Sequence, residues 1–368
     1  MNFVAFLILS AVIAYWSETV VAKNVKGRPL VVLATPNGKQ DEYYGEFYDE
    51  IVGFQTNFSK IIQDKDNVLI VAPEGEVYDQ LKCQLPGHVL KGSIKDIWMR
   101  DIGSSRQQNP ILFKYWPNYI FPKSYRNTIR NSFLKVLSDY GVKQSDFEPS
   151  ELILDGGNFV GNGVDTVVMT SRVYDDNYNF GRKKQIRNQL YDETNYENVA
   201  IIKQIKGDTT GHSDGMVSFI DTRTLALSDL GDRRMTRRYF RKLRRMMRRT
   251  DVEVVIIPNR YKDEYWRTFT SACGLHINAL TTNKYVYVPT FGHDQANIDD
   301  GRHYDSNYDN QVLSAIRANT NKNVISVPVD YKICRMGGSV RCLSWQIEGE
   351  IADRLVDAAE QLAKNEKC

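Results

Sequence analysis

The feature that most constrains the fold of this chain is a pattern that recurs along it. A helical stretch is followed by a short apolar strand, and the strand often ends at a proline. The helical stretches that we expect are 43–62, 127–140, 183–190, 234–249 and 308–318. The strands that follow them are 67–73, 151–154, 198–205, 252–258 and 323–328. Units of roughly 50–80 residues that mix strands with one helix predict a cyclic α/β array instead of a doubly wound sheet.

Turn-rich polar segments follow these strands. They are 97–103, 155–159, 207–216, 278–284 with 289–294, and 335–345. If the strands of such an array converge on its axis, their polar ends meet there. The sequence therefore predicts one site that is assembled from distant parts of the chain.

Cys342 lies in the last of these segments and is the candidate nucleophile. Gly337 and Gly338 allow the backbone to turn tightly and to approach a ligand closely. The alternation in residues 340–343 predicts a short strand, which would keep the thiol rigid and reachable. The alternative is a buried structural cysteine, because a free cysteine packs as a small hydrophobic residue.

A histidine and three aspartates are candidate partners of this cysteine. A thiol needs a lowered pKa or a nearby base to act as a nucleophile at neutral pH. His212 and Asp214 are two positions apart, so on a strand they would line the same wall. Asp101 closes a Trp-Met-Arg-Asp run, and Asp155 opens a Gly-Gly turn. Read singly, such a histidine is structural and such aspartates are surface or turn residues.

Taken together, these residues predict the chemical nature of the ligand. Several carboxylates around one site require a cation, because like charges cannot otherwise stay ionised together. A planar guanidinium suits them, since two carboxylates can grip it bidentately from two sides. The ring of Trp98 could stack on the alkyl chain or on the cation of such a ligand.

Four motifs occur in an order that resembles a known family. They are WxRD at 98–101, GGN at 156–158, GHxD at 211–214 and GGxxxC at 337–342. Through them the chain resembles the guanidine-modifying enzymes of the pentein fold, and most closely the bacterial, Porphyromonas-type peptidylarginine deiminases and their agmatine deiminase relatives. The resemblance implies a five-bladed α/β-propeller of repeated strand-strand-helix-strand units, in a single domain that spans 23–368.

The resemblance also implies a role for each residue. Cys342 would attack the guanidinium carbon and His212 would act as general acid and base, while Asp101 and Asp214 would hold the guanidinium nitrogens. The residues implied to contact the substrate are Trp98, Asp155, Asn158 and Thr210. Ammonia would leave, and water would then release citrulline or a carbamoyl product. The chemistry that the resemblance implies requires no metal or other cofactor.

Within the family we expect a protein-arginine deiminase. Agmatine deiminases carry a Gly-Gly-Gly-Asn-x-His-Cys segment, from which Ser339 and Arg341 depart here. The sequence leaves two alternatives open: a deiminase of agmatine or another small guanidine, and a catalytically silent binding protein. The preference for C-terminal or internal arginine is also open, although Lys123, Arg126 and Arg130 lie in the region where relatives hold a terminal carboxylate.

Residues 1–22 predict a secretory signal peptide, because residues 3–14 are nearly all apolar but too few to span a membrane. The mature chain keeps five cysteines, and this odd number leaves at least one thiol unpaired in an oxidising compartment. If that thiol is Cys342, the other four can form two disulfides in three possible pairings. We therefore expect a secreted protein. Relatives of this type also occur in arthropod venoms, a setting that such a protein fits.

The segment Arg233–Arg249 holds ten arginine and lysine residues in seventeen positions. Met235, Tyr239 and Leu243 recur within it at helical spacing, which predicts an amphipathic helix with a basic outer face. One interpretation is a solvated outer helix, and the other is a surface for anionic glycans or membranes. The formal net charge of only +3 argues against a nucleic-acid partner, so protein or peptide arginine is the partner that we expect.

Overall fold

The computed structural model describes residues 22–104, 108–260, 264–294, 306–366 and 368. The signal peptide that the sequence predicts at 1–22 lies outside these ranges except for Ala22. Within them, every helix is too short or too polar to span a lipid bilayer.

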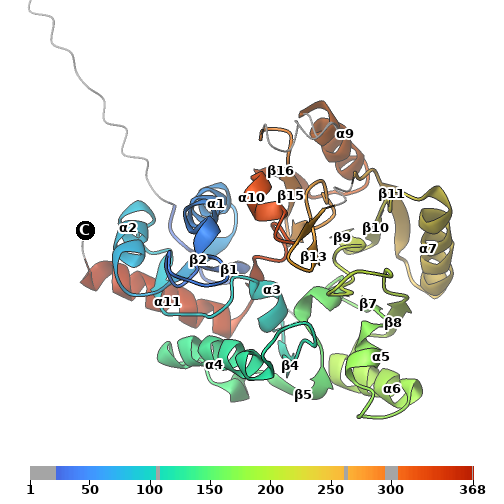
Figure 1. Ribbon diagram of the computed structural model, residues 1–368, viewed down its shortest axis with the longest axis horizontal. Coiled ribbons are helices and arrows are strands. Elements are labelled where there is room, and N and C mark those ends of the chain that lie inside the picture. Colours follow the sequence, from blue (N-terminus) through green and yellow to red (C-terminus); the bar gives the residue numbers. More distant parts are fainter. Residues whose placement is uncertain (1–21, 105–107, 261–263, 295–305, 367) are drawn as a thin grey trace, which may run out of the picture.

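Figure 1 shows small sheets placed around a common centre, with the longer helices outside them. The first sheet, in the order β17-β1-β2-β3, contains β1 (Leu30–Ala34), β2 (Asn67–Ala72), β3 (Val89–Lys91) and β17 (Trp345–Ile347). The next two along the chain pair β4 (Ile111–Lys114) with β5 (Glu148–Ile153), and join β6 (Val160–Gly161), β7 (Thr166–Thr170) and β8 (Asn198–Ile202). Then come β9 (Val217–Asp221), β10 (Thr224–Ser228) and β11 (Glu253–Ile257), the short pair β12 (Tyr265–Trp266) and β13 (Phe269–Thr270), and β14 (Leu280–Thr281), β15 (Tyr285–Thr290) and β16 (Asn323–Pro328).

The helices lie between these strands in the sequence. The α-helices are α1 (Tyr48–Ile62), α2 (Glu76–Gln84), α3 (Met99–Ile102), α4 (Lys123–Asp139), α5 (Arg172–Asp176), α6 (Lys183–Thr194), α7 (Arg233–Met246), α9 (Ser306–Arg317), α10 (Tyr331–Cys334) and α11 (Glu350–Asn365). The 3-10 helices are η1 (Gly45–Phe47), η2 (Gln144–Asp146), η3 (Gly156–Asn158) and η4 (Met247–Arg249).

Three sheets repeat one topology. In each, an antiparallel pair of strands is extended by a third strand that runs parallel to the second, and one long helix connects the second strand to the third. The three sets are β6-β7-α6-β8, β9-β10-α7-β11 and β14-β15-α9-β16. The first sheet has the same arrangement, but the antiparallel partner of β1 is β17, from the other end of the chain. The result is a mixed α/β fold.

Buried side chains join each sheet to the helix outside it. On α1, Ile51, Phe54, Phe58 and Ile62 recur every three or four residues and belong to the same core cluster as β2. Full burial of one such side chain stabilises the fold by about 1.5–3 kcal/mol. The apolar periodicity that predicts these helices is therefore also what attaches them to the sheets.

The predicted elements agree with the structure most closely where this periodicity is strong. The strand predicted at 323–328 is β16, and the helix predicted from residue 183 is α6, which continues to Thr194. The strand predicted at 340–343 is wrong. There, Leu343 N donates to Ser339 O at 3.1 Å and Ser344 N donates to Arg341 O at 3.1 Å, which are the hydrogen bonds of a helical turn.

Two disulfides select one of the three pairings that the sequence leaves open. Cys83 on α2 bonds to Cys368, and Cys273 bonds to Cys334 on α10. Cys342 carries a free thiol. Disulfides of this kind are compatible with an oxidising, extracellular compartment.

Candidate active site

A pocket of about 620 Å³ is lined by residues from widely separated parts of the chain. Its lining includes six of the residues that the sequence singles out: Trp98, Asp101, Thr210, His212, Asp214 and Cys342. Aromatic side chains form much of the remaining wall. Two of them, Phe121 and Tyr265, are largely exposed and mark the mouth of the pocket.

The side chain of Asn278 holds Cys342 in place at this pocket. Asn278 Nδ2 donates to Sγ of Cys342 at 3.1 Å. Its Oδ1 accepts the backbone N–H of Cys342 at 3.3 Å and the hydroxyl of Ser339 at 3.1 Å. One amide group therefore fixes both the backbone and the sulfur, so the rigidity that we expected from a strand comes from a turn and a side chain.

Asp214 faces both the thiol and a buried arginine. The thiol of Cys342 donates to Asp214 Oδ2 across 3.8 Å, and Nε of Arg341 lies 3.5 Å from the same oxygen. Burial raises the pKa of Asp214, and Arg341 opposes this shift. Arg100 is buried beside them, and burial together with Arg341 lowers its pKa to about 9. Fixed cations thus share the neutralisation of carboxylates that the sequence alone assigned to the ligand.

His212 lies between two other carboxylates. Its Nε2 is 3.2 Å from Oδ2 of Asp155, and its Nδ1 is 3.7 Å from Oδ1 of Asp101. Burial by itself would lower the pKa of His212, but Asp101 and Asp155 raise it to about 10. Burial raises the pKa of Asp101 to about 7, against the opposing effect of His212. At neutral pH the imidazole is therefore a cation.

The thiol has the opposite preference. Burial, Asp214 and Asp101 raise the pKa of Cys342 well above its usual range, while the hydrogen bond from Asn278 opposes this shift. Before a ligand enters, the site therefore combines a neutral thiol with a charged imidazole. A cation bound between Asp101 and Asp214 would offset their negative field and make the thiolate easier to form.

Two glycines are required by the close approach of these side chains. A Cβ atom at Gly157 would lie 2.4 Å from Nδ1 of His212, and one at Gly338 would lie 2.4 Å from Cζ3 of Trp98. Gly157 N also donates to Asp101 Oδ1 at 3.1 Å. The glycines of the GGN and GGxxxC motifs thus make room for His212 and Trp98.

Residues 212–214 lie in a turn and not on a strand. Met216 N and Val217 N both donate to Ser213 O, as in a turn. The Ser213 hydroxyl points into the core and donates to Val168 O at 3.1 Å. His212 and Asp214, on either side of it, both line the pocket.

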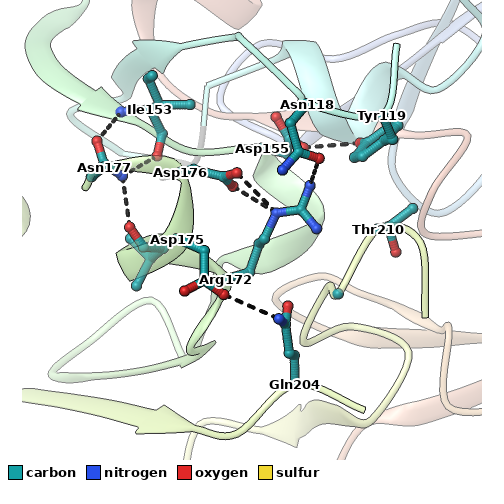
Figure 2. Close-up of polar contacts among 12 residues, drawn as sticks. Asn118, Tyr119, Ile153, Asp155, Arg172, Asp175, Asp176, Asn177, Gln204 and Thr210 are labelled. Atoms are coloured by element: carbon teal, nitrogen blue, oxygen red, sulfur yellow. Dashed lines mark hydrogen bonds and ion pairs between the residues drawn. The ribbon is translucent and has the colours of Figure 1, made fainter. Parts of the chain in front are cut away.

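Two polar groups that contact His212, Asp155 and Tyr119, point toward each other in Figure 2. The Tyr119 hydroxyl donates to Asp155 Oδ2 at 2.9 Å and lies 3.5 Å from Nε2 of His212. Burial and Asp155 raise the pKa of Tyr119 well above its usual range, so the phenol remains a donor. The Asp155 carboxylate is therefore fixed from one side by a phenol and fixes the imidazole on the other.

Arg172 of α5 anchors the loops that carry Tyr119 and Thr210 (Figure 2). Its Nε lies 2.9 Å from both carboxylate oxygens of Asp176, and the pair is buried. Its Nη2 donates to Asn118 Oδ1 and its Nη1 donates to Thr209 O at 3.2 Å. The guanidinium lies 5.6 Å from the centre of the Tyr119 ring. One buried ion pair thus holds two stretches of the pocket wall.

Two of the expected substrate contacts are not at the pocket wall. Asp155 lies behind His212, and its contacts are those of a residue that orients the imidazole. Asn158 is buried, and its Oδ1 accepts the backbone N–H of Thr170 at 2.8 Å. The contacts of Asp155 and Asn158 are therefore those of residues that support the site, although both lie in or beside the GGN motif. Trp98 and Thr210 do line the pocket.

The sequence reading did not single out Asn278 or Tyr119. Asn278 has one signal, since it opens the polar segment 278–284, one of those that the sequence predicts to meet at the site. Tyr119 lies in a loop rich in aromatic residues, and nothing in the sequence distinguishes it from Tyr115 or Trp116.

The solved structures to which this chain is similar include several deiminases. An agmatine deiminase of C. jejuni with bound substrate aligns with 20% identity and a TM-score of 0.65, over 89% of this chain and 96% of that chain. An agmatine deiminase of Enterococcus faecalis aligns with 18% identity and a TM-score of 0.66, over 89% and 95% of the two chains. A protein provisionally named a peptidyl-arginine deiminase aligns with 18% identity and a TM-score of 0.69, over 89% and 98%. Among curated protein sequences none matches the chain.

The family model that the chain matches defines its class, the hydrolases that deiminate a guanidino group, and solved deiminases share its fold. Within that class, the chain belongs to the Porphyromonas-type peptidyl-arginine deiminase family, which it matches over residues 24–347.

Proposed function

We propose that the protein is a secreted protein-arginine deiminase, which converts peptide arginine to citrulline and ammonia. The observation that carries this proposal is the shape of the pocket. It extends from Cys342 to the exposed rings of Phe121 and Tyr265. Its volume of about 620 Å³ is large enough for a ligand bigger than a single side chain. A guanidinium at Cys342 would leave room at the mouth for the peptide that bears it.

The first half-reaction forms a covalent intermediate. The guanidinium binds between Asp101 and Asp214, and the thiol proton passes to Asp214 Oδ2, which it already faces. Sγ of Cys342 bonds to the guanidinium carbon and gives a tetrahedral adduct. His212, as imidazolium, then protonates one nitrogen, the carbon–nitrogen bond breaks and ammonia leaves. The product of this half-reaction is a thiouronium cation on Cys342.

The second half-reaction returns the thiol. Neutral His212 takes a proton from water as the water oxygen bonds to the thiouronium carbon. The carbon–sulfur bond then breaks, sulfur recovers a proton from the new hydroxyl, and citrulline leaves. The proton held by Asp214 passes to solvent, where ammonia becomes ammonium. Asp155 and Tyr119 keep the imidazole oriented through both steps.

The proposed fold and location go with this function. The four strand–strand–helix–strand sheets, together with the β4–β5 pair, support a five-bladed α/β-propeller with the pocket at its axis. The two disulfides support export through a signal peptide at 1–22.

Agmatine deimination is the second candidate, and the likeness to solved agmatine deiminases favours it. The charge of the pocket lining argues the other way. Lys95, Lys206 and Arg267 line the pocket, and they would repel the free ammonium of agmatine. Asp101 and Asp214 in the same lining are assigned to the guanidinium, and Asp96 and Asp208 offset two of these three positive charges.

Mass spectrometry of three compounds tests the proposal: a peptide with an internal arginine, a peptide with a C-terminal arginine, and agmatine. A gain of about one dalton on either peptide, the difference between NH and O, is the expected result. Conversion of agmatine alone would establish the second candidate. If none of the three changes, the protein is a binding protein that keeps the fold.

A further inference from the structure

The segment Arg233–Arg249 forms one continuous cationic surface. It consists of α7 and η4, and all ten of its arginine and lysine side chains are exposed. We call this set the basic face; it comprises Arg233, Arg234, Arg237, Arg238, Arg241, Lys242, Arg244, Arg245, Arg248 and Arg249. In Figure 1, α7 lies at the periphery of the molecule, outside β9, β10 and β11. At 1.5 Å per residue the face is roughly 25 Å long.

The opposite side of the helix fixes this orientation. Tyr239, Leu243 and Met247 are buried in the core cluster that contains β9, β10 and β11. The side chain of Asp232 caps the helix by accepting the backbone N–H groups of Arg234 and Met235, at 2.7 Å and 2.8 Å. The rotation of the helix about its axis is therefore fixed, with the charged side chains facing solvent.

The basic face lacks carboxylate partners within the part of the chain that the structure describes. In the described part of the chain, none of its ten side chains forms an ion pair with a carboxylate. Elsewhere exposed cations do pair, as Arg223 does with Asp165 at 2.7 Å. Ten like charges along one helix repel one another, so the basic face lowers the stability of the protein when no anion is bound.

We propose that the basic face binds a sulfated glycan. A linear chain of sulfate groups matches a straight row of arginines, because each guanidinium can donate two parallel hydrogen bonds to one sulfate. The disulfides support an oxidising compartment outside the cytosol, where sulfated glycans are available polyanions. Met235, in the first turn of α7, lines the pocket, so a glycan on the face would hold the active site beside the surface that carries the glycan.

Two other polyanions fit the basic face less well. Insertion into a membrane needs exposed apolar side chains, but those of α7 are buried or half-buried beneath the charges. Single-stranded nucleic acid needs aromatic rings on which bases stack, and the exposed positions of the face carry only cations.

The test compares two triple variants of the full chain. One removes a ridge of the basic face, Arg237→Gln, Arg241→Gln and Arg244→Gln. The matched control removes three dispersed exposed cations, Lys60→Gln, Lys184→Gln and Arg317→Gln. The probes are heparin, duplex DNA and vesicles that contain phosphatidylserine, at matched salt.

We expect the first variant to bind heparin about tenfold more weakly or worse, while the control stays within about twofold of the unmodified protein. Turnover of a small arginine peptide should be the same in all three proteins, which shows that the variants are folded. Equal losses in both variants would overturn the proposal, because net charge alone would then explain binding. Tighter binding of DNA or vesicles than of heparin would also overturn it.

Discussion

Oδ2 of Asp155 lies 3.2 Å from Nε2 of His212, on the far side of the imidazole from Asp101. The contact places a carboxylate behind the ring, where a substrate cannot reach it. Asp101 and, after it, this contact with Asp155 raise the pKa of His212, which burial alone would lower, to about 10. The imidazole of this site is therefore prepared as an acid before any substrate arrives.

The hydroxyl of Tyr119 should matter through this contact. In Tyr119→Phe, Asp155 loses the donor at 2.9 Å, the imidazole is held less firmly, and kcat should fall about tenfold with little change in KM. Steady-state kinetics on an arginine peptide measures both constants. Tyr115→Phe is the matched control, because Tyr115 lines the same pocket and its hydroxyl makes no hydrogen bond to a described residue. Equal effects of the two changes would refute a positioning role for Tyr119.

Cys342→Ala should abolish turnover and leave the fold intact. The methyl group cannot bond to the guanidinium carbon, so ammonia release should fall to the uncatalysed background. Ammonia release and the circular dichroism spectrum are the two measurements. Undiminished ammonia release from this variant would remove Cys342 from the mechanism.

The pH dependence of kcat/KM should be bell-shaped. The pKa of Asp101 is about 7, so as pH falls through that value the carboxylate is protonated and grips the guanidinium less well. The pKa of His212 is about 10, so as pH rises through that value the proton needed by the leaving ammonia is lost. Activity should therefore be highest between about 7 and 10. A maximum at pH 5 would contradict these assignments.

Breaking the Arg172–Asp176 pair should weaken both the fold and the site. Arg172→Gln leaves Asp176 buried without its partner, so the free energy of unfolding should fall by about 3–5 kcal/mol. Chemical denaturation measures this loss, and kcat should fall with it because the loops of Asn118 and Thr209 are released. Arg223→Gln breaks the pair with Asp165, which is more exposed, and should cost less than about 1 kcal/mol. Similar losses in the two variants would show that the buried pair is not special.

The two disulfides should differ in their effect on activity. Replacing Cys83 and Cys368 by serine removes a link across 285 residues and should lower stability by about 2–5 kcal/mol, with activity at 25 °C unchanged. Replacing Cys273 and Cys334 should also lower activity, because Ala272 and Met336, next to the bonded segments, line the pocket. Thermal melting and ammonia release distinguish these outcomes.

The elements that could be predicted from the sequence are those in which buried apolar side chains recur at helical or strand spacing. Helices and strands such as α6 and β16 bury one face at a regular interval, so the spacing of their apolar residues predicts them. Residues 340–343 show the limit of this reasoning. Val340 and Leu343 are both fully buried and three positions apart, which suits one face of a helical turn as well as it suits part of a strand.

The candidate site could be predicted in part, because glycine-flanked Cys, His and Asp residues carry a chemical signal. Four such residues, Asp101, His212, Asp214 and Cys342, meet at one pocket, which Trp98 and Thr210 also line. Tyr119, Asn278 and Arg172 could not be found in this way, since their importance lies in partners that are distant in sequence. Nothing local to Arg172 shows that Asn118 and Thr209 will reach it.

The pairing of β1 with β17 also sets when the active site can exist during synthesis. Cys342 lies three residues before β17, and β17 takes its place only beside a strand made more than 300 residues earlier. A chain still attached to the ribosome can fold its first helices before Cys342 has been translated, or before β17 holds Cys342 in position. The active site can therefore assemble only after almost the whole chain has been translated.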